Sequence, residues 1–326
     1  MKTMKRVLIT EHMHERGYEV LNAHSDIEIV WIDDIEPSTL VNAVKDVDAI
    51  ITRSAFLTSD ILKGAEKLQV VSRHGVGCDN IDVAYLSARH IPVAIASGAN
   101  SRSVAEHTMG LMLAAARELP LLDQVVKTGK WADRNDYRAC DLFGAKIVIL
   151  GFGRIGRLVA PLCKAFGMDV VVADIKLDAD LASEMGCRGV TDFRPELADA
   201  DFLTLHVPLD NSTRHIISTS ELAAMKPESI LINCARGGVV DDDALLNALD
   251  NGHLRGAALD VMHTEPPASD HPLILRSDVV MTPHNGAAST SASIAMAEMS
   301  AQNVIDTFNG VLRDDCTFNL EGLKAA

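Results

Sequence analysis

The most constraining feature of the sequence is a glycine-rich turn between two apolar runs, within residues 146–174. The run Ile147–Leu150 leads directly into Gly151, and two further glycines complete the pattern GFGRIG before a helical stretch that ends near Phe166. A second apolar run then leads to Asp174. Strand, tight turn, helix, strand and acid in this order are typical of a βαβ unit that binds a dinucleotide.

Each glycine of this pattern has a separate physical task. Gly151 allows the sharp turn, Gly153 lets the backbone approach a pyrophosphate, and Gly156 lets the helix lie close to the strand. Unpaired backbone N–H groups and the positive end of the helix then bind the pyrophosphate. Asp174 lies roughly 20 residues beyond the first glycine, where a carboxylate accepts hydrogen bonds from ribose hydroxyls. The motif predicts NAD, because this carboxylate repels the 2′-phosphate of NADP, although Lys176 would weaken the repulsion.

Composition limits the fold class and the partners. The 326 residues are enough for two domains, and a chain with 48% hydrophobic but only 4% aromatic residues must have aliphatic cores, as parallel α/β sheets do. A net charge of −15 argues against nucleic acids and anionic membranes as partners, and it requires a local basic pocket for any anionic substrate. The most apolar stretch, residues 108–116, is too short to cross a bilayer. Six cysteines without Cys-x-x-Cys spacing, and no signal-like N-terminus, predict a cytoplasmic location.

Short α/β units repeat along nearly the whole chain. In the first hundred residues the expected strands are Val7–Thr10, Ile27–Trp31, Ala49–Thr52, Val70–Arg73 and Val93–Ala96. Beyond the dinucleotide unit they are Phe202–His206, Ser229–Asn233, Ala257–Asp260 and Val279–Thr282. Because these runs are too apolar to have a solvated face, the sequence predicts parallel sheets with helices on both sides.

Two long helical patterns accompany these units. Ser101–Leu119 follows a candidate hinge at Gly98–Asn100 and is apolar nearly all round, so it must be buried, between domains or between subunits. Ser291–Phe308 is long enough to return and cover the first domain. The tail, residues 309–326, has little pattern.

Three polar side chains follow strands in the second half of the chain, where they could act beside a nicotinamide. Arg236 lies in a glycine-rich loop, and its planar guanidinium can bind a carboxylate together with a carbonyl oxygen, or form a structural ion pair with the acids at 241–243. The imidazole of His284 can exchange a proton with a hydroxyl or ketone near neutral pH, and His206 is its rival at another strand end. Glu265 could hydrogen-bond the imidazole, although taken alone it is typical of a surface loop.

Other groups of polar or glycine residues give weaker evidence for a binding site. His12 and His14 have no third ligand at a suitable spacing, so no metal site is predicted. The stretch Gly75-Val76-Gly77 forms either a plain turn or a nest, a group of backbone N–H groups that binds an anion.

Several motifs together resemble the D-2-hydroxyacid dehydrogenase family. They are GFGRIG with Asp174, NCARGG around Arg236, ALDV and EPP around Glu265, and PHNGA around His284. RSAFLT, GVGCDNID and SVAEHT extend the resemblance to the first domain, so that it covers nearly the whole chain. Within the family the likeness is greatest to the D-3-phosphoglycerate dehydrogenases, through AEKLQVVSRHGVGCDNID and INCARGGVVDDDALLNAL. The C-terminal serine-sensing domain of some of these enzymes is expected to be absent.

The resemblance implies a fold, a reaction and an assembly. The fold has two doubly wound parallel-sheet domains: a Rossmann cofactor domain, residues 101–289, inserted into a flavodoxin-like substrate (lid) domain of residues 1–100 and 290–326. The reaction is hydride transfer between NAD and C2 of a small anionic 2-hydroxy or 2-keto acid. 3-Phosphoglycerate/phosphohydroxypyruvate is the first candidate, and hydroxypyruvate, glyoxylate or another 2-keto acid is the alternative. Relatives usually form dimers through the cofactor domain, so a homodimer is expected.

The resemblance also implies roles for individual residues. His284 matches the general acid/base, Glu265 its partner, and Arg236 the substrate-binding and polarising residue. The positions expected to line NAD are Gly151, Gly153, Arg154, Ile155, Gly156, Asp174, His206, Val207, Pro208, Thr213, Cys234, Ala235, Asp260 and Gly286. The positions expected to bind the substrate are Arg53, Ser54, Val76 and Gly77, and Arg53 and Arg134 could reach a substrate phosphate.

Two other classes use similar elements. Transcriptional corepressors that sense NAD(H) share the fold, and they can keep the same three polar residues. A methyltransferase with a glycine-rich loop is disfavoured by the later NCARGG and PHNGA motifs.

Overall fold

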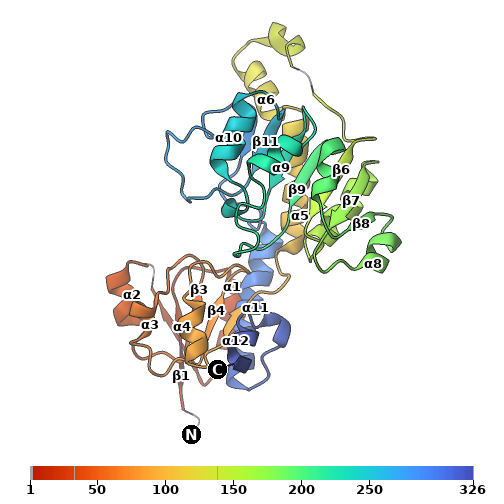
Figure 1. The fold of residues 1–326 in the computed structure, drawn as a ribbon. Helices are drawn as coiled ribbons and strands as arrows, with labels where there is room; N and C mark the ends of the chain where they lie inside the picture. The colour runs from red at the N-terminus through yellow and green to blue at the C-terminus, as the bar shows by residue number, and fades with distance from the viewer. Residues whose placement is uncertain (1–2, 33, 138, 326) are drawn as a thin grey trace. The chain divides into compact units, whose positions relative to one another are not determined.

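The structure, a computed structural model, describes residues 3–32, 34–137 and 139–325. The chain divides into two compact units. Unit 1 consists of residues 1–100 and 288–326, and unit 2 of residues 101–287, which lie between these two segments in the sequence. Each unit is built around one parallel sheet (Figure 1), so the predicted α/β fold with two parallel sheets is confirmed.

The sheet of unit 1 has five strands in the order β2-β1-β3-β4-β5, which is flavodoxin-like. The strands are β1 (Lys5–Ile9), β2 (Ile27–Trp31), β3 (Ala49–Thr52), β4 (Val70–Arg73) and β5 (Val93–Ile95). The helices of this unit are α1 (Glu15–Asn22), α2 (Pro37–Ala43), α3 (Ser59–Leu62), α4 (Val83–Ala88), α11 (Thr290–Phe308) and α12 (Leu320–Ala325). Strands β3 and β5 are buried along their whole length, because helices cover both faces of the sheet.

Helix α11 returns to unit 1, as expected from its length, and packs against α1 and β4. A Cβ added at Gly17 of α1 would lie 2.9 Å from the carbonyl oxygen of Ala297, so the two helices approach closely. The tail, in which little pattern was expected, contains the short helix α12. The Asn319 side chain holds this segment: it accepts from the Val93 amide (2.8 Å) and donates to the Ile91 carbonyl (3.0 Å).

The sheet of unit 2 has seven strands in the order β12-β11-β10-β9-β6-β7-β8, the doubly wound Rossmann order. The strands are β6 (Lys146–Leu150), β7 (Asp169–Ala173), β8 (Arg188–Val190), β9 (Phe202–Leu205), β10 (Ile230–Asn233), β11 (Gly256–Leu259) and β12 (Val279–Met281). The α-helices are α5 (Ser101–Ala116), α6 (Leu119–Lys127), α7 (Gly156–Ala165), α8 (Ala179–Glu184), α9 (Thr219–Ala224) and α10 (Asp242–Asp250). Short 3₁₀ helices lie at Trp131–Asn135, Arg194–Asp199 and Gly237–Val239.

Helix α5 is buried within unit 2, where it packs against α7, β10 and β11. It ends at Ala116, three residues earlier than expected, because Glu118 adopts a left-handed conformation (φ +53°) before α6 begins. No helix among residues 3–32, 34–137 and 139–325 combines the length and apolar character needed to cross a bilayer. All six cysteines are free thiols.

Candidate active site

The glycine-rich turn after β6 is closed on one side and open on the other. Gly151 has φ +101°, and a Cβ there would lie 2.4 Å from the carbonyl oxygen of His206. A Cβ at Gly156 would lie 2.0 Å from the carbonyl oxygen of Gly151, so both positions require glycine. A Cβ at Gly153, in contrast, would meet no heavy atom within 4 Å. The open side leaves the space that a dinucleotide pyrophosphate needs next to the backbone.

Asp174 is held beside this turn at the end of β7. Its Oδ2 accepts a hydrogen bond from the Phe152 amide (2.8 Å), and its Oδ1 accepts one from the Lys176 amide (2.8 Å). Backbone contacts of this kind orient the carboxylate for a ribose diol. Lys176 contacts the Asp174 carboxylate through its backbone amide. The carboxylate keeps its negative charge next to the turn, as expected of a site for NAD.

The other polar residues of interest in unit 2 follow the four strands that lie on one side of β6 in the same sheet, β9 to β12. His206 follows β9, Arg236 follows β10, Asp260 follows β11 and His284 follows β12. Because all these strands are parallel, their carboxyl ends share one edge of the sheet. The structure therefore brings the glycine turn, the arginine and the histidines to the edge where ligands bind in such folds.

Asp260 organises the turn after β12. Its carboxylate is buried (3% exposed) and accepts from the Thr282 hydroxyl at Oδ1 (2.6 Å), from the Asn285 amide at Oδ1 (2.7 Å) and from the Gly286 amide at Oδ2 (2.9 Å). The amide of His284 donates to the carbonyl of Asp260 (2.8 Å). These bonds hold His284 in a left-handed conformation (φ +51°), which a residue with a side chain adopts only when its surroundings enforce it.

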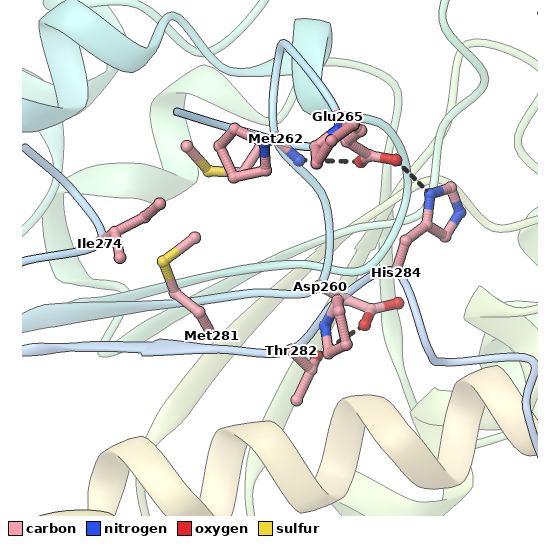
Figure 2. A pocket seen from close by; sticks show the side chains of 10 residues that line it. Asp260, Met262, Glu265, Ile274, Met281, Thr282 and His284 are labelled. Atoms are coloured by element: carbon pink, nitrogen blue, oxygen red, sulfur yellow. Dashed lines mark hydrogen bonds and ion pairs between the residues drawn. The ribbon is translucent and has the colours of Figure 1, made fainter. Parts of the chain in front are cut away.

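His284 and Glu265 form a close pair (Figure 2). Nδ1 of His284 lies 2.6 Å from Oε2 of Glu265, whose Oε1 accepts from the Met262 amide (3.0 Å). Burial raises the pKa of Glu265, but the bonds from His284 and Met262 and the positive charge of Arg236 outweigh it, and the pKa is lower than usual. An ionised carboxylate only accepts, so Nδ1 carries a proton and Nε2 is the nitrogen that can exchange one with a ligand.

Arg236 is positioned by the side chain of Asn233 at the end of β10. Oδ1 of Asn233 accepts a hydrogen bond from the Ala235 amide (3.0 Å), and Nδ2 of Asn233 donates one to the Arg236 carbonyl (3.0 Å). The half-buried guanidinium donates to the Ala235 carbonyl (2.7 Å). The next residue, Gly237, is so close to the Glu265 loop that a Cβ there would lie 1.9 Å from the Met262 carbonyl oxygen. The loops that carry the arginine and the glutamate are thus in direct contact.

A pocket of about 440 Å³ opens beside the Glu265–His284 pair (Figure 2). Its apolar lining lies next to the carboxylate and the imidazole. The lining residues are Asp260, Met262, Glu265, Pro266, Pro267, Ile274, Met281, Thr282, Pro283 and His284. The charged pair therefore has an apolar surface on one side.

His206, the rival acid/base candidate, is unsuited to proton transfer at neutral pH. Burial lowers its pKa to about 3, so the ring is neutral, and its Nε2 is 3.0 Å from the Thr204 hydroxyl. Nearby, burial raises the pKa of the Cys234 thiol to about 12. Both side chains can line a cofactor without carrying charge.

The remaining positions expected to line NAD lie at the start of α7 and in the loop after β9. Arg154 is exposed and Ile155 half-buried at the start of α7. Thr213 closes the loop after β9 by donating from its hydroxyl to the Pro208 carbonyl (2.6 Å), and Val207 follows His206 in the same loop.

The first expected substrate loop, in unit 1, already binds a carboxylate of the chain itself. Glu11 accepts from the amides of Arg53 (2.9 Å), Ser54 (2.7 Å) and Ala55 (3.3 Å). Burial raises the pKa of Glu11, but these hydrogen bonds hold it below its usual value. The Ser54 amide is therefore engaged within the chain, through a long-range contact that has no local signal in the sequence.

The second expected substrate loop, Gly75–Gly77, is braced by Arg73. The guanidinium of Arg73 donates from Nε to the Gly77 carbonyl (2.8 Å) and from Nη1 to the His74 carbonyl (2.7 Å). The amides of Val76 and Gly77 donate to no acceptor in the part of the chain that the structure describes. This favours an anion-binding nest over a plain turn.

Two further observations bear on the sequence-based expectations. Within the ranges that the structure describes, no three His, Cys, Asp or Glu side chains are arranged to hold a metal ion. His107 Nε2 of α5 lies 3.0 Å from the Thr282 hydroxyl and 3.3 Å from Oδ1 of Asp260, a contact that the sequence analysis did not predict.

Comparison with known proteins identifies relatives of the whole chain. The model of the D-isomer specific 2-hydroxyacid dehydrogenase NAD binding domain matches residues 109–286. The D-3-phosphoglycerate dehydrogenase of Methanocaldococcus jannaschii is 40% identical over 313 residues, which are 96% of this chain and 59% of that protein. A chloroplastic D-3-phosphoglycerate dehydrogenase of Arabidopsis thaliana is 37% identical over 94% of this chain and 49% of its own length. The chain thus spans only about half the length of such relatives.

Solved structures of similar fold also include dehydrogenases and reductases of this kind. A D-lactate dehydrogenase from Aquifex aeolicus, complexed with NAD and lactic acid, is 29% identical with a TM-score of 0.81, covering 98% of both chains. A glyoxylate/hydroxypyruvate reductase from Sinorhizobium meliloti, in complex with NADP and malonate, is 28% identical with a TM-score of 0.84, covering 94% of both. The family model covers more than half of the chain, and the resemblance inferred from the motifs is confirmed. The chain belongs to the D-isomer specific 2-hydroxyacid dehydrogenase family.

Proposed function

We propose that the protein transfers a hydride between NAD and C2 of a small D-2-hydroxy acid or its 2-keto acid. The observation that carries the proposal is the 2.6 Å contact between His284 Nδ1 and Glu265 Oε2, at the same sheet edge as the glycine turn and Arg236. An imidazole held by a carboxylate is a proton donor and acceptor matched to an alcohol–ketone pair. In this proposal unit 2 is the cofactor domain and unit 1 the substrate domain.

The residues have distinct tasks in the oxidative direction. When bound, NAD supplies the carbon that accepts the hydride. Nε2 of His284 removes the hydroxyl proton, and Glu265 stabilises the imidazolium that results. Arg236 binds the substrate carboxylate and the oxygen at C2, whose negative charge its guanidinium compensates. In reduction, protonated His284 returns the proton to the ketone oxygen.

The first candidate substrate is 3-phosphoglycerate, or phosphohydroxypyruvate in reduction. The phosphoglycerate dehydrogenases among the relatives support it, and so does Arg53, which is exposed and whose guanidinium has no partner among the described residues. The free amides of Val76 and Gly77 suit the substrate carboxylate. Hydroxypyruvate, glyoxylate and pyruvate remain the alternatives, since all share the 2-keto carboxylate.

We propose further that the protein is a cytoplasmic homodimer joined through unit 2. Three large apolar side chains are more than half exposed on α6 and the 3₁₀ helix that follows it: Leu119 (51%), Val126 (57%) and Trp131 (64%). Exposed apolar residues gathered on one segment are typical of an interface.

A substrate panel tests the proposed reaction. Phosphohydroxypyruvate, hydroxypyruvate, glyoxylate and pyruvate are each supplied with NADH and, in parallel, with NADPH, and cofactor oxidation is followed by absorbance. We expect reduction of at least one keto acid, fastest for phosphohydroxypyruvate, with NADH preferred. NADH binding without turnover of any keto acid would instead support an NAD(H)-sensing binding protein related to the corepressors.

A further inference from the structure

We propose that His107, on α5, is a positioning residue for His284 and acts through Thr282 and Asp260. The inference rests on the proposed function, because it gives His107 a part in proton transfer by His284. All four residues belong to unit 2.

The hydrogen bonds among three of these side chains have a fixed direction. The Thr282 hydroxyl lies 2.6 Å from Oδ1 of Asp260, and a buried carboxylate only accepts, so the hydroxyl proton points to Asp260. His107 Nε2 lies 3.0 Å from the same hydroxyl oxygen and 3.3 Å from Oδ1 of Asp260, and neither oxygen has a proton left to donate. Nε2 must therefore carry the hydrogen, and the chain of donors runs from His107 through Thr282 to Asp260.

The acceptor at the end of this chain controls the backbone on both sides of His284. Asp260 binds Thr282 on one side and the amides of Asn285 and Gly286 on the other. The His284 amide itself donates to the carbonyls of Asp260 (2.8 Å) and Thr282 (3.0 Å). The left-handed conformation of His284 thus depends on where the Asp260 carboxylate lies.

His107 makes a polar contact between α5 and this arrangement. Its side chain is 23% exposed, and its ring packs against the turn: a Cβ added at Gly286 would lie 3.5 Å from His107 Cδ2 and 3.0 Å from Asp260 Oδ2. The His107 ring and the Asp260 carboxylate therefore both lie next to the turn that follows His284. Without the imidazole donor, the Thr282 hydroxyl and the Asp260 carboxylate lose their hydrogen-bond contact with α5. The His284 side chain then loses its fixed orientation toward the substrate.

Two substitutions remove the donor chain with little change in shape. His107→Phe keeps a ring and removes the donor, and Thr282→Val removes the hydroxyl. Loss of one hydrogen bond to a charged group corresponds to roughly a tenfold change or more, so we expect each variant to lower kcat for keto-acid reduction about tenfold. NADH affinity should stay within threefold, as measured by fluorescence titration. The double variant should be no slower than the slower single variant, because both changes break the same chain.

Conservative and matched variants separate positioning from general stability. His107→Gln keeps an N–H donor and should recover most of the lost kcat. His253 provides the control, since its Nε2 lies 2.9 Å from the Met225 carbonyl, outside the candidate site. His253→Phe should lower Tm by an amount similar to His107→Phe but leave kcat unchanged.

The proposal is overturned if His107→Phe keeps the wild-type kcat, if the two single effects add in the double variant, or if His253→Phe is equally slow. A wild type that reduces no keto acid would instead refute the proposed function. The inference about His107 is then tested by the ¹⁵N resonances of the His284 ring, assigned with His284→Gln. These should move in His107→Phe and stay in place in His253→Phe; resonances unchanged by His107→Phe overturn the inference.

Discussion

Replacement of Gly153 by alanine tests whether the glycine turn of unit 2 binds a pyrophosphate. A Cβ at this position meets no heavy atom within 4 Å, and the φ of Gly153 lies outside the left-handed range. The folded chain therefore accepts the methyl group without strain. A compatible Gly→Ala change stabilises the folded state by roughly 0.4–1 kcal/mol through the unfolded chain. For a unit of this size the gain raises Tm by about 1–4 °C.

The same methyl group occupies the space that the pyrophosphate needs. At this glycine the backbone must approach the ligand directly, so a side chain displaces the ligand from the N–H groups of the turn. A hydrogen bond to a charged group contributes roughly 1.5–3 kcal/mol, and the loss of one such bond weakens binding by about 10- to 150-fold. Gly153→Ala should thus be at least as stable as the wild type and bind NADH far more weakly.

Thermal unfolding and NADH fluorescence titration measure the two effects separately. Gly156→Ala is the contrasting variant: its Cβ would lie 2.0 Å from the Gly151 carbonyl oxygen, so it should lose stability as well as affinity. Wild-type NADH affinity in a stable Gly153→Ala protein would refute the assignment of the pyrophosphate to this turn. A large fall in its Tm would contradict the open geometry.

Three other substitutions test the neighbouring residues. Arg236→Lys keeps the charge but loses the planar fork, and kcat/KM for the keto acid should fall roughly 10- to 100-fold; an unchanged value would remove Arg236 from the substrate site. Asp174→Asn removes the charge that repels a 2′-phosphate, so the preference for NADH over NADPH should fall by roughly tenfold or more in initial rates. Because the pKa of Glu265 lies below its ordinary 4.5, its stabilising contribution is complete above pH 4.5 and is lost as the pH falls through the lowered pKa. Denaturant unfolding should therefore show Glu265→Gln less stable than the wild type at pH 6, with a smaller difference at pH 3; a difference that grows with acid would contradict this sign.

Much of the fold of unit 2 could be predicted because it is encoded in short stretches of sequence, the apolar runs and the glycine pattern. The strand–glycine–strand pattern that ends at Asp174 predicts its own topology, and apolar runs mark β9, β10 and β11. Arg236 and His284 stand out because each lies three residues beyond the end of a strand, Arg236 after β10 and His284 after β12. Parallel strands then place these ends at one edge without any knowledge of the loops between them.

The elements that sequence reasoning missed have no local apolar pattern. Strand β8 lies at the edge of the sheet with the burial pattern exposed, exposed, half-buried, so it shows no hydrophobic run. Helix α12 has only six residues, too few for a repeated helical pattern, and the Asn319 side chain just before it bonds to the Val93 amide. Glu11 reaches a loop more than forty residues away, and His107 reaches Thr282 across 175 residues. Contacts of this kind arise only when the tertiary structure forms.

Single-turnover hydride transfer with and without the His284 imidazole tests whether His284 is the general acid of the reaction. NADH-saturated wild type and His284→Ala are each mixed with phosphohydroxypyruvate in a stopped-flow instrument, and NADH absorbance is followed. General acid catalysis contributes roughly 10²- to 10⁴-fold, so we expect the rate of hydride transfer to fall by that factor in His284→Ala, with NADH affinity within threefold of the wild type. Equal rates of hydride transfer in the two proteins would contradict it.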